Sequence, residues 1–181
     1  MRITGGSLCG RKVETPDGVI RPAMDRMRES VFAIIGDLTG ATFLDIFSGS
    51  GTIALEAASR GASYIEAVEA DPIKRPTILK NVSISPVRIE CHFMKAELYV
   101  KRAKRPFDWI FLDPPFPYGF KQELVSRVIA SKLVGDGTTI LIHHPREDRF
   151  PDAIDGFPRI DRREYGRSIV SFYRKVEEEG E

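Results

Sequence analysis

The sequence contains few of the features that mark secreted, membrane-spanning or metal-binding proteins. Its 181 residues include only two cysteines, Cys9 and Cys91, which lie far apart without a paired spacing. This scarcity argues against a disulfide framework or a cysteine-based zinc site, and we expect both thiols to be reduced. No apolar run approaches the length of a membrane span, and the N-terminus lacks the apolar core of a signal peptide. We therefore expect a cytoplasmic protein with no membrane partner.

Histidine is also scarce, and the three histidines are poorly placed for a metal ion. His143 and His144 are adjacent in a predicted strand, so their side chains should point to opposite faces. His92 is distant in the sequence, and no cysteine pair assists it. We expect no metal site and a mechanism that needs no metal.

The most informative motif is Asp113-Pro114-Pro115-Phe116, which follows the apolar run Trp109–Leu112. A planar ring can stack on Phe116, while the Asp113 carboxylate and the Pro114 carbonyl accept hydrogen bonds from an exocyclic amine. The two prolines fix φ and lack N–H groups, so the turn presents only acceptors. Pro-Pro is also an ordinary way to end a strand. We favour the functional interpretation and take all four residues as candidate catalytic residues.

A second motif lies upstream, where a short apolar strand over residues 42–47 leads into a turn containing Gly49 and Gly51. A run of good helix formers with helical spacing follows. Strand, glycine turn and helix form the opening of a nucleotide-binding βαβ unit. Glu69 comes at the end of the next apolar strand, eighteen residues after Gly51, where a carboxylate can accept both ribose hydroxyls of an adenosine.

Two cofactors fit this arrangement. The glycine turn matches the dinucleotide pattern G-x-G-x-x-A, which favours NAD, although such a match is weak by itself. Asp45, four residues before Gly49, would repel a pyrophosphate but would attract a cationic amino-acid group. S-adenosyl-L-methionine has an ammonium group, a ribose and no phosphate, and it also accounts for the later Asp113 motif. The motifs therefore predict S-adenosyl-L-methionine as the cofactor.

The pattern along the chain predicts an α/β fold with a doubly wound, mostly parallel sheet. Strands and helices alternate after a helix over residues 25–35, and residues 159–174 have the alternation of a final antiparallel hairpin. Turn signals predict a small β-hairpin appendage over residues 1–20. A chain of this length buries roughly 70% of its unfolded surface, which is enough for a single domain over residues 1–181. In such sheets ligands bind beyond the carboxyl ends of the strands.

The whole chain resembles the bacterial 16S ribosomal RNA guanine-N2 methyltransferases of the RsmD type. The residues that carry this resemblance are Arg2-Ile3-Thr4-Gly5-Gly6, Gly10-Arg11-Lys12, Arg21-Pro22, Asp25-Arg26, Arg28-Glu29, Leu44-Asp45, Phe47, Gly49-Ser50-Gly51, Leu55-Glu56-Ala57, Ser59-Arg60-Gly61-Ala62, Glu69 and the Asp113 motif. The resemblance implies a Rossmann-like fold with a seven-stranded sheet and methylation of the exocyclic amine of one guanine. It also implies Phe47 and Ala96 as cofactor-binding residues, beside Asp45, Gly49, Gly51 and Glu69. Lys95 departs from the Asp or Asn that is common in this family, so any adenine contact there would come from the backbone.

The chain has almost no net charge, since 27 basic residues balance 26 acidic ones, but the charges are clustered. For the first cluster, which is glycine-rich and loop-like, we favour contact with RNA phosphates. Its members are Arg2, Arg11, Lys12, Arg21, Arg26 and Arg28. A middle cluster of Lys101, Arg102, Lys104 and Arg105 is left undecided. A third, at residues 159–167, is diluted by acidic residues and favours a solvated face.

The expected partner is small-subunit ribosomal RNA or an assembling 30S subunit, and we expect a monomer. Two alternatives stay open. The Asp113 motif does not choose the base, so an amino-methyltransferase acting on adenine or cytosine of DNA fits the same residues. The chain lacks room for a separate target-recognition domain, which disfavours that alternative. The second alternative is a non-catalytic RNA-binding or ribosome-assembly factor, against which the intact motifs argue.

Overall fold

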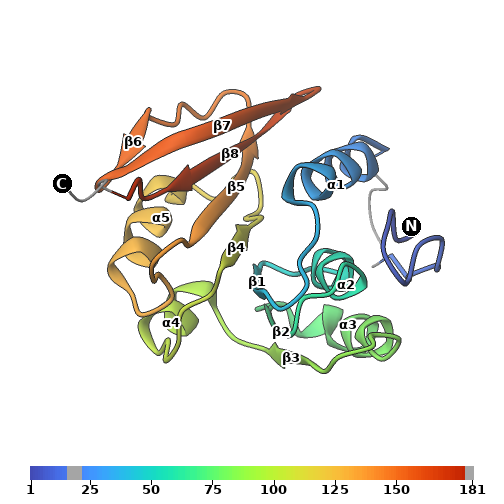
Figure 1. The fold of residues 1–181 in the computed structure, drawn as a ribbon. Coiled ribbons are helices and arrows are strands. Elements are labelled where there is room, and N and C mark those ends of the chain that lie inside the picture. Colours follow the sequence, from blue (N-terminus) through green and yellow to red (C-terminus); the bar gives the residue numbers. More distant parts are fainter. Residues whose placement is uncertain (16–21, 178–181) are drawn as a thin grey trace.

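The computed structural model describes residues 1–15 and 22–177. Its centre is a twisted sheet of eight strands in the order β3-β2-β1-β4-β5-β8-β7-β6, with helices on both faces (Figure 1). The strands are β1 (Thr42–Ile46), β2 (Tyr64–Val68), β3 (Ile89–His92), β4 (Trp109–Leu112), β5 (Thr139–Pro145), β6 (Ala153–Ile154), β7 (Phe157–Tyr165) and β8 (Ser168–Arg174). The helices are α1 (Pro22–Ile35), α2 (Thr52–Ser59), α3 (Arg75–Val82), α4 (Ala96–Lys101) and α5 (Lys121–Ala130), with a 3-10 turn η1 (Pro72–Lys74).

The first five strands run parallel, and β8 pairs antiparallel with both β5 and β7. Central strands that are covered on both faces need almost continuous apolar sequence, which β1 and β4 provide. The predicted doubly wound α/β fold with an antiparallel C-terminal hairpin is confirmed. The sheet has one strand more than the predicted seven, because the two-residue strand β6 pairs with the start of β7.

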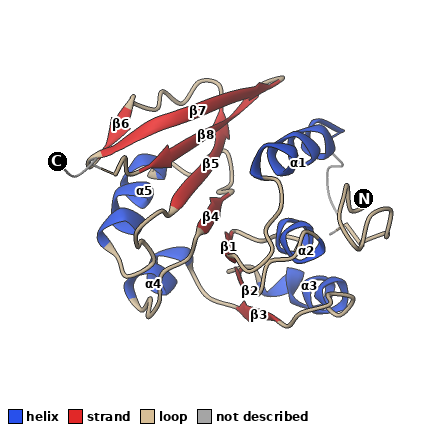
Figure 2. Ribbon diagram, in the orientation of Figure 1, coloured by secondary structure: helices blue, strands red, loops and turns tan. Residues whose placement is uncertain are grey.

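Alternate residues of each strand enter two separate hydrophobic cores. Phe43, Phe111 and Leu141 pack beneath α1 and α2, whereas Ile110 and Ile142 pack beneath α4 and α5. Figure 2 shows the two groups of helices on opposite sides of the sheet. The position of a residue in this alternation therefore also decides on which face of the sheet its side chain lies near the carboxyl ends of β4 and β5.

The N-terminal segment doubles back on itself over residues 1–13. An antiparallel bridge joins Arg2 and Lys12, with backbone hydrogen bonds from Ile3 N–H to the Arg11 carbonyl and from Val13 N–H to the Met1 carbonyl, whereas residues 16–20 of the predicted hairpin lie outside the described residues. The segment docks on the end of α2, where Ser59 bonds the backbone of Ser7, Leu8 and Gly5. A Cβ at Gly6 would lie 2.0 Å from the Ser59 carbonyl oxygen, so this close approach requires glycine.

Within the described part of the chain, no helix is long and apolar enough to cross a membrane.

Candidate active site

Three carboxylates meet at the carboxyl edge of the sheet. Asp45 lies in β1, Glu69 follows β2 and Asp113 follows β4. The parallel register explains this convergence, because Asp45 pairs with both Ala67 and Phe111. A cavity of about 130 Å³ is lined by Asp113, by the glycine turn and by two methionines of α1, whereas Asp45 and Glu69 do not line it. The sequence-predicted residues Phe47, Gly49 and Asp113 therefore share one cavity.

Asp113 is held by His143, a contact that the sequence did not predict. The Nδ1 atom of His143 lies 2.8 Å from Asp113 Oδ1, and the carboxylate can only accept, so Nδ1–H donates. The His143 side chain is 1% exposed and its ring contacts the edge of Phe116, with 5.5 Å between ring centroids. Leu112 pairs with Ile142 in the sheet, which places the next residue of each strand side by side. His143 therefore fixes one oxygen of a partly exposed carboxylate.

The two adjacent histidines serve different surroundings, as the strand alternation predicts. His144 lies 3.0 Å from Ser171 Oγ through Nε2 and stacks on Phe150 at 4.2 Å, on the side of α5. Burial lowers the pKa of His144. It therefore belongs to the second core and not to the cavity that Asp113 lines.

The loop after Asp113 is fastened by a buried lysine. Lys121 is 5% exposed and donates to the carbonyl oxygens of Phe116 at 2.7 Å and Tyr118 at 2.6 Å. Its ammonium group also lies 2.8 Å from Asp148. Pro114 is buried, Pro115 is exposed and Phe116 is half-buried, so the motif forms one wall with a partly accessible ring. The loop that carries the predicted catalytic residues is thus anchored from behind.

The glycine turn has a backbone conformation that suits a bound ligand. Phe47 has φ of 65°, which is rare and costly for an aromatic residue and is typical of functional turns. Gly49 has φ of 62° with open space where a Cβ would point, and its N–H donates to Glu69 at 2.8 Å. Gly51 has φ of 81° and faces Val82 of α3 closely. Glu69 also accepts from Asp71 N–H at 2.9 Å, so its carboxylate is fixed beside the turn.

Asp45 is fully buried, and its two oxygens differ. Oδ2 accepts from Ser48 Oγ at 2.7 Å and from Ala54 N–H at 3.2 Å. Oδ1 has no hydrogen-bond partner among the described residues. Burial raises the pKa of Asp45 to about 7, and the nearby negative charges of Asp113 and Glu69 add to the rise, although the bonds to Oδ2 oppose it. The Asp45 carboxyl group therefore lacks a positively charged partner among the described residues.

Ala96, the remaining predicted cofactor residue, is buried at the first position of α4, beyond the carboxyl end of β3. It packs in the second core and does not line the cavity that holds Asp113.

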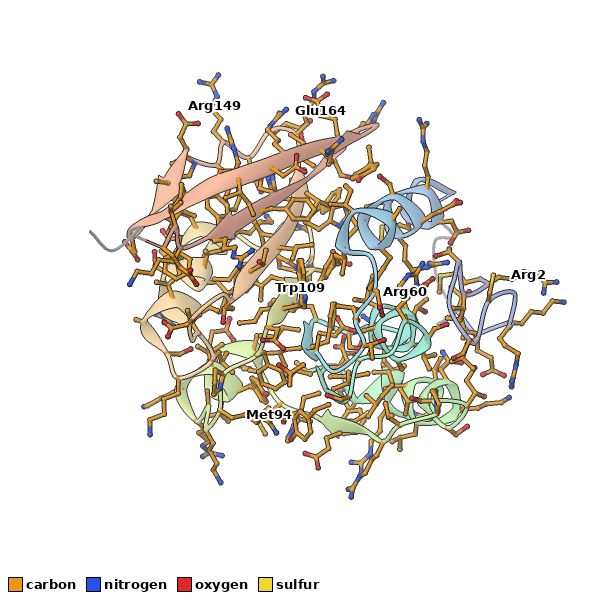
Figure 3. The ribbon with its side chains drawn as sticks, in the orientation of Figure 1. Arg2, Arg60, Met94, Trp109, Arg149 and Glu164 are labelled. Atoms are coloured by element: carbon orange, nitrogen blue, oxygen red, sulfur yellow. The ribbon has the colours of Figure 1, made fainter. Side chains whose placement is uncertain are left out.

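The predicted RNA-contacting residues separate into two groups. Arg2, Arg11, Lys12 and Arg26 are exposed, and Arg2 projects away from the body of the protein (Figure 3). Three of them, Arg2, Lys12 and Arg26, line a cavity of about 550 Å³ that shares Met1 and Arg28 with the cavity beside Asp113. Arg21 lies outside the described residues.

The prediction for Arg28 is wrong. Arg28 is 3% exposed, and its guanidinium group bonds Glu56 at 2.8 Å, the Arg2 carbonyl at 2.7 Å and Asp25 at 3.1 Å. Glu56 is fully buried and also pairs with Arg60. Arg28 therefore ties α1 and the N-terminal segment to α2, and most of its donors are already engaged by protein acceptors.

One cluster among the described residues has the composition of a metal site. Possible ligand atoms of Glu66, Glu90 and His92 lie within 4.8 Å of one another on β2 and β3. These groups already bond one another and Tyr64: His92 contacts Glu66, and the Tyr64 hydroxyl lies 3.3 Å from both carboxylates. We assign no ion to this cluster.

The fold and the site together define the class of S-adenosylmethionine-dependent methyltransferases. The fold is a parallel sheet in the order 3-2-1-4-5 with an antiparallel hairpin at its edge. The site has a glycine turn after β1, an acidic residue after β2 and Asp-Pro-Pro-Phe after β4. The methyl donor of this class is S-adenosyl-L-methionine. Within this class the chain belongs to the family described as conserved hypothetical protein 95, the RsmD-type methyltransferases, whose model matches residues 1–174.

Three relatives illustrate this placement. Ribosomal RNA small subunit methyltransferase D of Escherichia coli (strain K12) is 30% identical over 154 residues, covering 83% of this chain and 78% of that protein. The solved structure of hypothetical protein TTHA0928 of Thermus thermophilus has a TM-score of 0.81 and 28% identity, covering 97% of this chain and 99% of that one. A tRNA1(Val) (adenine(37)-N6)-methyltransferase of Shewanella loihica is 31% identical over 116 residues, covering 61% of this chain but 43% of that protein.

The residues at the carboxyl edge fit the chemistry of this cofactor. The unpartnered, buried oxygen of Asp45 and the raised pKa of its carboxyl group indicate a place that gains from a positively charged ligand. The open side of Gly49 leaves room for close approach to the backbone. Asp45, Gly49 and Glu69 would hold the cofactor here, and their assignment stays a prediction.

Proposed function

We propose that this protein transfers a methyl group from S-adenosyl-L-methionine to the exocyclic N2 amine of a guanine in small-subunit ribosomal RNA. The observation that carries the proposal is the Asp113 carboxylate, fixed through Oδ1 by His143 at the cavity beside the glycine turn. The printed name of the Escherichia coli relative supports small-subunit ribosomal RNA as the acceptor. The choice of guanine N2 rests on the family resemblance.

Each residue of the motif has a defined part in this proposal. The cofactor supplies a methyl group on a positively charged sulfur. Asp113 and the Pro114 carbonyl accept hydrogen bonds from the amine and turn its lone pair toward that methyl group. Phe116 stacks on the base, which offsets roughly 1–3 kcal/mol of the cost of leaving its own stack. Alignment of the reacting atoms can contribute about 7–11 kcal/mol.

Charge explains why the acceptor beside the amine is a carboxylate. Methyl transfer makes the amine cationic, and Asp113 stabilises that charge until one amine proton leaves. Oδ2 is the oxygen available for this task, because His143 already donates to Oδ1. The rigid Pro114-Pro115 turn and the Lys121 clamp hold the loop in place during the step.

The proposal is tested by labelled methyl transfer to small ribosomal subunits that lack their modifications, followed by nucleoside analysis. We expect N2-methylguanosine at one site. Asp113→Ala should bind the cofactor normally and lose at least about a hundredfold in transfer rate, since misplacing the amine removes the alignment. An Asp113→Ala variant as active as the wild type would refute the assignment of Asp113.

Three other outcomes would select an alternative. N6-methyladenosine in the product would favour adenine as the base. We include this outcome because one relative is named as a tRNA adenine-N6 methyltransferase. Labelled duplex DNA would favour the DNA alternative. Cofactor binding without transfer to any acceptor would favour a non-catalytic assembly factor.

We also propose that the protein acts in the cytoplasm as a monomer on ribosomal RNA or an assembling 30S subunit, with Arg2, Arg11, Lys12 and Arg26 contacting phosphates. These four side chains are exposed, and their surface adjoins the catalytic cavity through Met1.

A further inference from the structure

Helices α4 and α5 lie on the opposite side of the sheet from the N-terminal segment (Figure 2). A second basic surface lies between these two helices. It is a groove of about 940 Å³. We call it the α4–α5 groove, and its lining residues carry six positive charges against the single acidic residue Glu97. The basic residues are Lys95, Lys101, Arg102, Lys104, Arg127 and Lys132, and all six are exposed. The middle basic cluster of the sequence thus contributes three members, while Arg105 stacks over Tyr64 instead.

Arginines of the C-terminal hairpin form ion pairs with nearby carboxylates, whereas the basic residues of the groove form none among the described residues. Arg159, Arg162 and Arg163 each form an ion pair with a nearby carboxylate, so that surface is internally neutralised. Within residues 1–15 and 22–177, no salt bridge involves any of the six basic residues of the groove. Glu97 attracts Lys95 and Arg127 without a salt bridge, but the groove keeps an excess of positive charge. The remaining like charges repel one another, and a bound polyanion relieves that repulsion.

One end of the groove is linked to the loop that carries the candidate catalytic residues, although no residue of that loop lines the groove. Glu97, in its lining, accepts a hydrogen bond from the Tyr118 hydroxyl. Tyr118 in turn contacts Phe47 of the glycine turn edge-on, with 5.7 Å between ring centroids. Both helices start at the carboxyl edge of the sheet. The groove follows α4 from Lys95 to Lys104 and includes only the last part of α5 and the residues after it, up to Lys132. A strand that lies along the whole groove therefore approaches the Asp113 loop at the end where Glu97 bonds Tyr118.

We infer that the α4–α5 groove binds the phosphate backbone of the RNA strand that presents the target base. This inference rests on the proposed function. RNA fits better than an acidic protein segment, because Leu98 is the one large apolar side chain of the groove that is exposed among the described residues, at 38%. A docked helix or strand needs a row of apolar anchors. A phosphate chain needs the repeated cations that the groove supplies. Together with the exposed N-terminal arginines, the groove holds RNA on both sides of the catalytic edge.

The test compares two triple variants with the same change in charge. The groove variant is Lys101→Gln with Arg102→Gln and Lys104→Gln. The control variant is Arg146→Gln with Arg162→Gln and Arg163→Gln, which neutralises three exposed arginines of the hairpin region that are already paired. Binding of deproteinised 16S ribosomal RNA is measured by filter retention at several salt concentrations. Cofactor affinity and thermal stability are measured in parallel.

For the groove variant we expect at least tenfold weaker RNA binding, and a salt dependence shallower by about 0.7 to 0.9 per lost phosphate contact. Cofactor affinity should be unchanged, and the control variant should bind RNA within twofold of the wild type. Equal RNA affinity of the groove and control variants overturns the inference. So does a groove variant that loses affinity for intact subunits but not for deproteinised RNA, since the groove would then contact a ribosomal protein. Methyl transfer is scored separately, so an inactive wild type that still binds RNA through the groove refutes the proposed reaction and leaves this inference standing.

Discussion

Replacing His143 should show how much of the methyl-transfer rate depends on the orientation of the Asp113 carboxylate, because Asp113 itself is kept. In the folded protein, His143 donates from Nδ1 to one oxygen of Asp113 and packs against Phe116. His143→Leu fills the same space but cannot donate, so the Asp113 carboxylate gains rotational freedom. His143→Asn places an amide N–H near the position of Nδ1 and should keep the bond. Because His143 holds Asp113 and does not itself touch the amine, we describe it as a positioning residue.

The size of the effect follows from the bond that is lost. A hydrogen bond to a charged group is worth about 1.5–3 kcal/mol. If the whole of it serves to orient Asp113, kcat falls by about tenfold to a hundredfold, since about 1.36 kcal/mol is a factor of ten in rate. The Asp113 side chain is 20% exposed, and water can replace part of the bond, so the lower end of this range is the expected value.

Steady-state methyl transfer with both variants provides the assay. We expect His143→Leu to lower kcat with unchanged affinity for cofactor and RNA, and His143→Asn to restore kcat to within about fivefold of the wild type. His144→Asn, one residue along the same strand, is the matched control and should alter stability without changing kcat. The reasoning is refuted if His143→Leu has the kcat of the wild type. It is also refuted if the Leu and Asn variants lose activity equally and in proportion to their melting temperatures.

Two further predictions concern stability. Glu56→Gln should destabilise the protein by about 3 kcal/mol in urea unfolding, because it leaves the buried Arg28 without its main partner. Asp25→Asn removes the exposed partner of the same arginine and should cost less than about 1 kcal/mol; similar losses for the two variants would contradict the structure. Asp45 predicts a pH dependence: its pKa is raised to about 7 in the folded protein, so its contribution to stability is present at low pH and is lost as pH rises through about 7. Urea unfolding of cofactor-free wild type should therefore show lower stability at pH 8 than at pH 5.5, and an Asp45→Asn variant that keeps the whole of this difference would disprove the assignment.

The sequence alone predicted the fold class and the positions of the main motifs, because both depend on local signals. Apolar strands of four to seven residues, a glycine turn and a following helix are visible over short windows. Asp45, Glu69 and Asp113 each stand at or just past the carboxyl end of such a strand, so a parallel sheet brings them together whatever the details of packing. The docking of the N-terminal segment was less predictable, since Gly6 is needed for close contact with Ser59 and Gly5 for close contact with Arg60.

Tertiary structure alone decided which polar side chains meet. His143 is thirty residues from Asp113 in the sequence and reaches it only because Leu112 pairs with Ile142. Arg28 looks like its basic neighbours in sequence, yet it is buried because it faces Glu56 of α2, twenty-eight residues away. The basic residues of α4 and those of α5 form one groove only once the two helices lie side by side. Local sequence records residue type and periodicity, whereas burial, pairing and shared charge depend on partners that are distant along the chain.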